Sequence, residues 1–198
     1  MLASVLLVVA AYLLGSISFA VVVSRLFGLP DPRAYGSGNP GATNVLRTGN
    51  KAAALLTLAG DGLKGFVGVW IAQRFAPTDM LEWTIAAAAL AVFLGHLFPV
   101  FHRFAGGKGV ATAAGILFAL HWPLGMALTV VWLAMAFGFK ISSLAALTTA
   151  VLMPLGMFYV FGPIAATWST VAIAALLFWR HRGNISGLMA GRERRIGG

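Results

Sequence analysis

The chain has no cysteine and very few acidic residues. Without cysteine it can form no disulfide, no thiolate nucleophile and no zinc-thiolate site. Its 198 residues include only five Asp and Glu against 14 Lys and Arg. With so few carboxylates and no clustered histidines, no metal site can be assembled convincingly, and we expect neither a metal nor a cofactor.

Charge of either sign is scarce and apolar residues dominate. Charged residues make up 10% of the chain and hydrophobic residues 60%, whereas an average globular protein carries about 25% charge. This composition excludes an ordinary soluble domain and predicts an all-α, polytopic protein surrounded by membrane lipids. The length fits one integral membrane domain over residues 1–198. The net charge of +9 lies in short loops, so it is read as a topology signal and not as nucleic-acid binding.

Long apolar runs predict the transmembrane helices. Five are clear: Leu2 to Leu26, Ala52 to Phe75, Leu81 to Phe101, Leu144 to Phe161 and Ile164 to Trp179. The run from Val110 to Phe139 would form a helix about 45 Å long, too long for a hydrocarbon core of about 30 Å. Because a proline disfavours helical geometry in the residue before it, His121-Trp122-Pro123 is a predicted break.

The distribution of cations favours about seven spans over six. With six, Lys140 and the arginines of the tail fall on the side opposite to Arg47 and Lys108. With seven, only Arg74 of the Lys and Arg residues lies clearly outside, and Lys64 lies within a span. We therefore expect an external N-terminus, a cytoplasmic C-terminus and cytoplasmic polar loops.

The first polar loop runs from Gly36 to Asn44, with an arginine three residues later. Glycines there alternate with hydrogen-bonding side chains, which favours a phosphate site, although a merely flexible loop is the alternative. The candidate binding residues of this loop are Ser37, Asn39, Thr43, Asn44 and Arg47.

The second polar segment is a glycine loop that leads into a predicted helix. Backbone N–H groups and the positive end of the helix dipole favour an anion there, and a lysine adds a full charge. The spacing is not that of a Walker A loop, which makes nucleotide hydrolysis an unfavoured reading. Its candidate residues are Gly106, Gly107, Lys108, Gly109 and Thr112.

Ionisable residues near this loop are further candidates. His96 lies twelve residues before Lys108 and could be either an interfacial histidine or a catalytic one. Asp61 and Lys64 lie inside a span at i, i+3 spacing, where charges are costly and usually paired. A structural pair and a functional pair both remain open; Lys64 is a candidate for phosphate binding and Asp61 for structural support.

The third polar segment follows the last span. A basic tail there is ordinarily a topology anchor. His181 and Asn184, at i, i+3 spacing, could instead point into the same site as the other two segments. Glycines, cations and amides in all three segments together favour binding of phosphate groups.

The order and content of these motifs resemble the bacterial acyl-phosphate:glycerol-3-phosphate acyltransferase family, small integral membrane enzymes that make lysophosphatidic acid. The resemblance extends from Tyr12 to Ile185 and includes Leu63-Lys64-Gly65 and Gly95-His96. It implies a seven-helix protein of the bacterial cytoplasmic (inner) membrane, with its active site facing the cytoplasm and acyl phosphate and glycerol 3-phosphate as substrates.

The same resemblance implies roles for single residues. Ser37 and Arg47 correspond to essential residues and are therefore candidates for catalysis, and the segment 106–109 corresponds to the glycerol 3-phosphate motif. His181 and Asn184 correspond to residues that support activity, and Glu193 to one that supports integrity. One departure is Ala105, where the family usually has lysine; Arg103 is a possible substitute.

The expected reaction is attack of the glycerol 3-phosphate 1-hydroxyl on the acyl phosphate carbonyl. Positioning and charge stabilisation would supply most of the rate, because phosphate is a good leaving group. The proton acceptor is either His96 or a phosphate oxygen of a substrate, and the sequence does not choose. The alternative from another class is a transporter of a small phosphorylated metabolite, although no internal repeat supports it.

Overall fold

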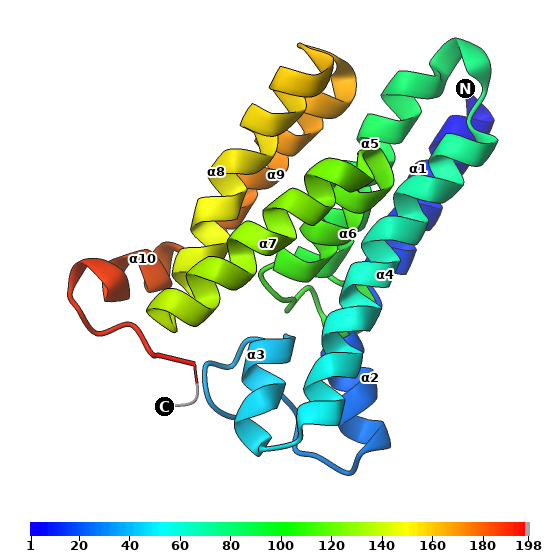
Figure 1. The fold of residues 1–198 in the computed structure, drawn as a ribbon. Helices are drawn as coiled ribbons and strands as arrows, with labels where there is room; N and C mark the ends of the chain where they lie inside the picture. Colours follow the sequence, from blue (N-terminus) through cyan, green and yellow to red (C-terminus); the bar gives the residue numbers. More distant parts are fainter. Residues whose placement is uncertain (197–198) are drawn as a thin grey trace.

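A computed structural model describes residues 1–196 as a helical bundle without a strand, which confirms the all-α prediction (Figure 1). The α-helices of the described residues are α1 (Leu2–Gly15), α2 (Phe19–Leu26), α3 (Ala42–Val45), α4 (Lys51–Phe75), α5 (Leu81–Leu97), α6 (Val110–Leu120), α7 (Trp122–Phe139), α8 (Ser142–Phe161), α9 (Ala165–Arg180) and α10 (Arg182–Met189). Short 3-10 turns lie at η1 (Leu46–Thr48), η2 (Thr78–Met80) and η3 (Val100–His102).

The helices are those of a membrane protein by length and hydropathy. Four described helices are long and apolar enough to cross a bilayer, and α1 with α2 makes a fifth if the bent pair counts as one span. Helices α6 and α9 are apolar but shorter. Large apolar side chains on the outside, among them Leu55, Trp70, Phe137 and Tyr159, are well exposed. In water such a surface would be a liability, and it suits contact with lipid.

One expected helix differs from the prediction, and one predicted break is confirmed. The run from Leu2 to Leu26 was expected to form one continuous helix, but α1 and α2 meet at an angle of 43°. The break lies at Ser16-Ile17-Ser18. The predicted break at His121 is present: His121 has an extended backbone, and its Nδ1 accepts a hydrogen bond from the N–H of Leu124 at 3.3 Å, which caps α7.

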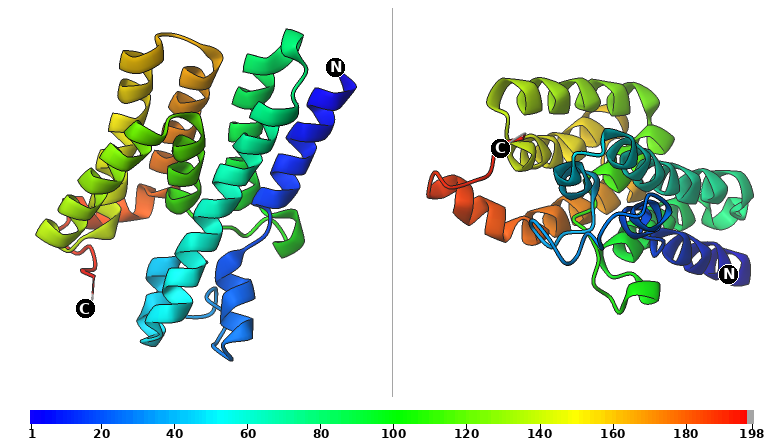
Figure 2. Two further views of the ribbon diagram at one scale, coloured as in Figure 1. Left: turned by 45° about the vertical axis from the view of Figure 1, so that its right-hand side comes forward. Right: turned by 90° about the horizontal axis from the view of Figure 1, so that it is seen from below.

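The helices alternate in direction, so that the three polar segments gather at one end of the bundle (Figures 1 and 2). The turns between α4 and α5, α6 and α7, and α8 and α9 lie toward the other end, near the N-terminus. Helix α6 lies in the middle and contacts α4, α5, α7 and α9. Its 11 residues cover only about 16 Å at ~1.5 Å per residue.

Small residues allow α4 and α6 to approach closely. A β-carbon on Gly65 would meet the carbonyl of Thr112, and one on Gly115 would meet the carbonyl of Gly62. Helix association in lipid relies on such close backbone packing, because lipid tails remove the hydrophobic drive between helices. These glycines therefore place the start of α6, and the loop before it, against α4.

We expect Gly115→Ala to destabilise the protein by about 1–3 kcal/mol, because the new methyl group would overlap backbone atoms of α4. The matched control is Gly138→Ala in α7, where no atom lies within 4 Å of the added β-carbon. Melting temperatures of both variants in detergent measure the effect. Equal melting temperatures would contradict the close packing of α4 on α6.

Candidate active site

The three polar segments form one open cleft of about 470 Å³. Each segment contributes: the first loop, the glycine loop before α6, and the turn from α9 into α10. The described residues that line the cleft are Ser37, Gly38, Asn39, Gly106, Lys108, Arg180, Arg182, Gly183 and Asn184. The expectation that segments far apart in the sequence lie together is therefore met by this structure.

The first loop folds around the buried side chain of Asn44. Its amide donates to the carbonyls of Pro32 (2.7 Å) and Tyr35 (3.1 Å). Its Oδ1 accepts from the backbone N–H of Ser37 (3.0 Å) and from Nη1 of Arg47 (3.1 Å). Asn44 was expected to bind phosphate, but its hydrogen-bonding groups are occupied within the loop. It orients Ser37 and Arg47.

A salt bridge stabilises the start of the same loop. Arg33 Nη2 lies 2.6 Å from Asp31 Oδ2. The hydrogen bonds from Arg33 lower the pKa of Asp31 to about 2, so that its carboxylate is charged at neutral pH. The chain thus enters the loop in a fixed direction.

The glycine loop turns back into the bundle at the end of α5. The N–H of Gly107 donates to the carbonyl of His96 at 3.2 Å. From the opposite side Arg180 donates through Nε to the Gly107 carbonyl (3.0 Å) and through Nη2 to the Gly106 carbonyl (2.6 Å). Gly106 and Gly107 are buried. The loop is therefore recessed, and one guanidinium donates hydrogen bonds to the carbonyls of both Gly106 and Gly107.

A chain of hydrogen bonds connects the cleft lysine to the tail. Lys108 Nζ donates to Asn184 Oδ1 at 2.5 Å, and Asn184 Nδ2 donates to Glu193 Oε1 at 2.6 Å. Glu193 Oε1 also accepts from the hydroxyl of Ser143 at 2.7 Å. Burial lowers the pKa of Lys108. Glu193 thus ties the tail to α8.

His181 is buried beside the cleft and does not line it. Its Nδ1 lies 2.8 Å from the carbonyl of Leu177, so that nitrogen carries the proton. Burial lowers its pKa to about 4, and the ring is neutral at neutral pH. His181 and Asn184 were expected to point together into the site; only Asn184 reaches the cleft.

A buried polar cluster lies beneath the glycine loop. Lys64 Nζ is 2.9 Å from Asp61 Oδ1, which is 3.6 Å from His96 Nδ1. The Thr112 hydroxyl donates to the Asp61 carbonyl at 3.0 Å and lies 3.2 Å from His96 Nδ1. The ion pair predicted for Asp61 and Lys64 is present. Lys64, Thr112 and His96 lie outside the set of residues that line the cleft.

Several expected residues occupy other positions. Thr43 is exposed on α3. Gly109 precedes α6 with φ +86°, and a β-carbon there would meet the ring of Phe93, so it serves packing. Ala105 and Arg103 are exposed, and neither is among the described residues that line the cleft. Arg103, the possible substitute for the lysine that the family usually has at position 105, thus lies outside the described lining of the cleft.

Two cations of the cleft were missed as site residues. Arg180 and Arg182 both line it, and each follows the last span, where a basic residue is ordinarily a topology anchor. The one available signal was the position of Arg180 and Arg182 on either side of His181. Nothing in the sequence relates Arg180 to Gly107, 73 residues earlier.

The chemistry of the cleft suits anions. Lys108, Arg180 and Arg182 supply cations, and Ser37, Asn39 and Asn184 supply hydroxyl and amide groups. Within residues 1–196 no three His, Asp or Glu side chains gather as a metal site would require. The described lining contains no carboxylate and no imidazole. Such a cleft can bind phosphate groups and stabilise developing negative charge.

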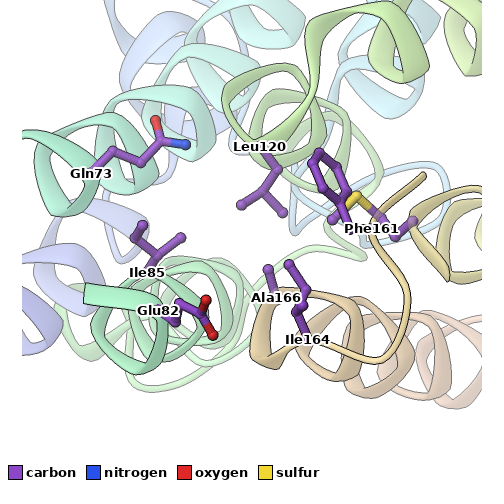
Figure 3. Close-up of a pocket in the computed structure, with 8 residues that line it drawn as sticks. Gln73, Glu82, Ile85, Leu120, Phe161, Ile164 and Ala166 are labelled. Atoms are coloured by element: carbon purple, nitrogen blue, oxygen red, sulfur yellow. The ribbon is translucent and has the colours of Figure 1, made fainter. Parts of the chain in front are cut away.

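A second hollow lies at the opposite end of the bundle (Figure 3). It is lined mainly by apolar side chains of α5, α6, α8 and α9, with Gln73 and Glu82 as the polar members. Gln73 Nε2 donates to the carbonyl of Ala119 at 3.0 Å, which satisfies a carbonyl near the end of α6. With one carboxylate and no cation among its lining residues, this hollow does not suit a phosphate.

Known proteins of one family are similar to this chain. A family model described as glycerol-3-phosphate acyltransferase matches residues 5–191. A glycerol-3-phosphate acyltransferase of Cupriavidus necator is 60% identical over 99% of this chain and 98% of its own length. One of Burkholderia ambifaria is 60% identical over 94% of this chain and 88% of its own.

Two solved structures are also similar to this chain. The crystal structure of PlsY (YgiH), an integral membrane glycerol 3-phosphate acyltransferase, in its glycerol 3-phosphate form has a TM-score of 0.91 at 41% identity and covers 98% of this chain and 96% of that one. The lysophosphatidic acid form of PlsY has a TM-score of 0.90 at 40% identity, with 98% and 95% coverage.

The neutral, buried His181 makes a pH-dependent contribution to stability. Because its pKa falls from 6.5 unfolded to about 4 folded, the unfolded chain binds the extra proton. Above pH 6.5 His181 does not reduce the free energy of unfolding. As the pH falls from 6.5 to 4, this free energy declines by up to about 3 kcal/mol. We expect His181→Gln to flatten this decline in melting temperature between pH 7 and 4.5. Parallel curves for both proteins would contradict it.

Proposed function

The chain belongs to the glycerol-3-phosphate acyltransferase family, and we propose that it transfers an acyl group from an acyl phosphate to the 1-hydroxyl of sn-glycerol 3-phosphate. The products are 1-acyl-glycerol 3-phosphate, which is lysophosphatidic acid, and inorganic phosphate, so the enzyme serves phospholipid biosynthesis. The observation that carries the proposal is the open cleft, in which three segments bring three cations and several hydrogen-bond donors together.

Both substrates present a phosphate, and the cleft supplies cations and hydrogen-bond donors for these negative charges. Lys108 and Asn184 are hydrogen-bonded to each other on one wall, and Ser37 and Asn39 lie on the first loop. Arg47 is exposed beside that loop and is aligned by Asn44. Charge-assisted hydrogen bonds to these groups would hold both phosphates and bring the 1-hydroxyl to the acyl carbonyl.

The reaction needs no acyl-enzyme. The 1-hydroxyl oxygen bonds to the carbonyl carbon, the bond from that carbon to the phosphate oxygen breaks, and phosphate leaves. Ser37 has its N–H bonded to Asn44, and its hydroxyl would orient a phosphate or carbonyl oxygen. Because the described lining of the cleft holds no carboxylate or imidazole, a substrate phosphate oxygen takes the proton. This choice sets aside His96 as the base.

The membrane arrangement follows from the charges. We propose seven crossings, counting α1 with α2 as one and α6 and α9 as short crossings, with the N-terminus outside and the C-terminus cytoplasmic. The cleft would then lie on the cytoplasmic side of a bacterial inner membrane. The acyl chain would lie among the apolar helices while its phosphate meets the loops.

The function is tested with purified protein in detergent, radiolabelled glycerol 3-phosphate and three separate donors: acyl phosphate, acyl-CoA and acyl-carrier protein. We expect labelled lysophosphatidic acid with acyl phosphate. Lys108→Met should reduce kcat/KM by roughly tenfold or more, because a charge-assisted bond to phosphate is lost. The control is Lys140→Met, the same change at an exposed lysine after α7.

Three outcomes contradict the proposal or part of it. Product with only acyl-CoA or acyl-carrier protein would overturn the donor. No product with any donor, together with uptake of labelled glycerol 3-phosphate by liposomes that contain the protein, would favour a transporter. Wild-type kinetics in Lys108→Met would remove the lysine from the site.

The orientation is tested by single cysteines, which are easily introduced because the chain has none. Ser37→Cys lies at the cleft and Trp122→Cys at the turn between α6 and α7. We expect a membrane-impermeant thiol reagent to label position 122 in intact cells and position 37 only after permeabilisation. The reverse pattern would invert the protein in the membrane.

A further inference from the structure

We propose that His96 is a positioning residue of the glycerol 3-phosphate site, which acts through Gly107 and is itself fixed by the buried pair Asp61 and Lys64. This inference rests on the proposed function. His96 is 7% exposed and lies under the glycine loop, outside the set of residues that line the cleft.

His96 contacts the glycine loop through both its backbone and its ring. Its carbonyl accepts the N–H of Gly107 at 3.2 Å. A β-carbon on Gly107 would collide with Nε2 of the His96 ring and would lie 2.9 Å from the carbonyl oxygen of Pro40. Gly107 is thus enclosed between the imidazole and the first loop. The position of the imidazole therefore limits where Gly107, the residue before Lys108, can lie.

The orientation of the imidazole is fixed from its other edge. Nδ1 lies 3.2 Å from the Thr112 hydroxyl and 3.6 Å from Asp61 Oδ1. Rotation of the ring would break both contacts and would move Nε2 away from Gly107. Thr112 is on α6, so these contacts also relate the loop to the helix that it starts.

The buried pair is anchored on the break between α1 and α2. Lys64 Nζ contacts Asp61 Oδ1 at 2.9 Å and donates to the carbonyl of Ile17 at 2.6 Å. A helix break inside the bundle leaves carbonyls that lipid cannot satisfy. Lys64 satisfies one of them and holds Asp61 beside His96. A continuous polar path therefore runs from Ile17 through Lys64, Asp61 and His96 to Gly107.

A role in positioning the glycine loop would account for the charged pair of Asp61 and Lys64 inside a membrane span, where charges are costly. A pair with a purely structural role needs no histidine between it and a substrate loop. The cluster connects the cleft to the first helix pair, so displacement of any member would shift the glycine loop. A displaced glycine loop would bind the phosphate of glycerol 3-phosphate less tightly, and the expected sign of this is a raised KM.

Two substitutions of His96 separate positioning from proton transfer. The amide of His96→Gln can reach the place of Nε2 under Gly107, whereas that of His96→Asn keeps contact near Thr112 and falls short of Gly107. Neither amide accepts a proton as a base does. We expect His96→Asn to raise the KM for glycerol 3-phosphate about tenfold, with kcat lowered no more than about threefold, and His96→Gln to restore most of that KM.

A second pair of variants tests the anchor. Asp61→Asn alone leaves Lys64 with a buried, unpaired charge and is expected to destabilise the protein. The neutral double variant Asp61→Asn with Lys64→Met removes that penalty. We expect the double variant to fold, and to show a raised KM for glycerol 3-phosphate with the KM for acyl phosphate within about twofold of wild type.

The control is His121→Asn. His121 is the N-cap of α7, at the turn between α6 and α7, and this turn lies toward the other end of the bundle. Asparagine is also a favourable N-cap residue, so this change leaves both the cap and the glycine loop in place, and both KM values should stay at the wild-type level. Melting temperatures with and without glycerol 3-phosphate are measured for every protein. The stabilising shift should shrink in His96→Asn and remain in His121→Asn and His96→Gln.

The outcomes are distinct. A loss of kcat of about a hundredfold or more in both His96 variants, at unchanged KM, would make His96 the base and overturn the proposal. Wild-type KM in His96→Asn would overturn it as well. A raised KM in His121→Asn would show that the same substitution far from the glycine loop moves KM, and would also overturn it. A wild-type protein inactive with every donor would instead defeat the proposed function, and this inference with it.

Discussion

The site depends on the need to pair every polar backbone group of a loop that enters an apolar bundle. The glycine loop leaves the end of α5, passes through the exposed segment 100–105 and returns to the level of His96. At that depth an unpaired N–H or carbonyl costs several kcal/mol. The His96 carbonyl takes the N–H of Gly107, and Arg180 takes the carbonyls of Gly106 and Gly107.

The same requirement explains the distribution of charge around the cleft. Arg180 is partly engaged by the loop carbonyls, and Lys108 by Asn184, so neither cation is free to move. A binding site whose donors are already oriented loses less entropy when a phosphate arrives, and its dipoles need no reorganisation during reaction. Glu193 lies one step further away, bonded to Asn184 and Ser143, where it stabilises the tail.

Close packing of α4 against α6 gives the recessed loop its support. Gly65 and Gly115 let the two backbones approach, and Thr112 on α6 bonds to the Asp61 carbonyl on α4. The short α6 then ends well before its neighbours, which leaves the apolar hollow near Leu120 and Phe161 (Figure 3). The fold thus has a polar cavity at one end and an apolar one at the other.

Sequence alone determined the membrane class, the helical fold, the break at His121 and the three polar segments, because hydropathy, proline and the positions of cations act locally or along a single span. It also paired Asp61 with Lys64 from their spacing on one helix. The bend between α1 and α2 has no proline to mark it, and the sequence analysis did not predict it.

Which polar residues face the cleft was decided only by the tertiary structure. Asn44 is enclosed by its own loop, His181 bonds to Leu177, and Arg180 reaches Gly106 across 74 residues. Such choices depend on which side chain can satisfy a buried backbone group, and that partner is known only when the helices are packed.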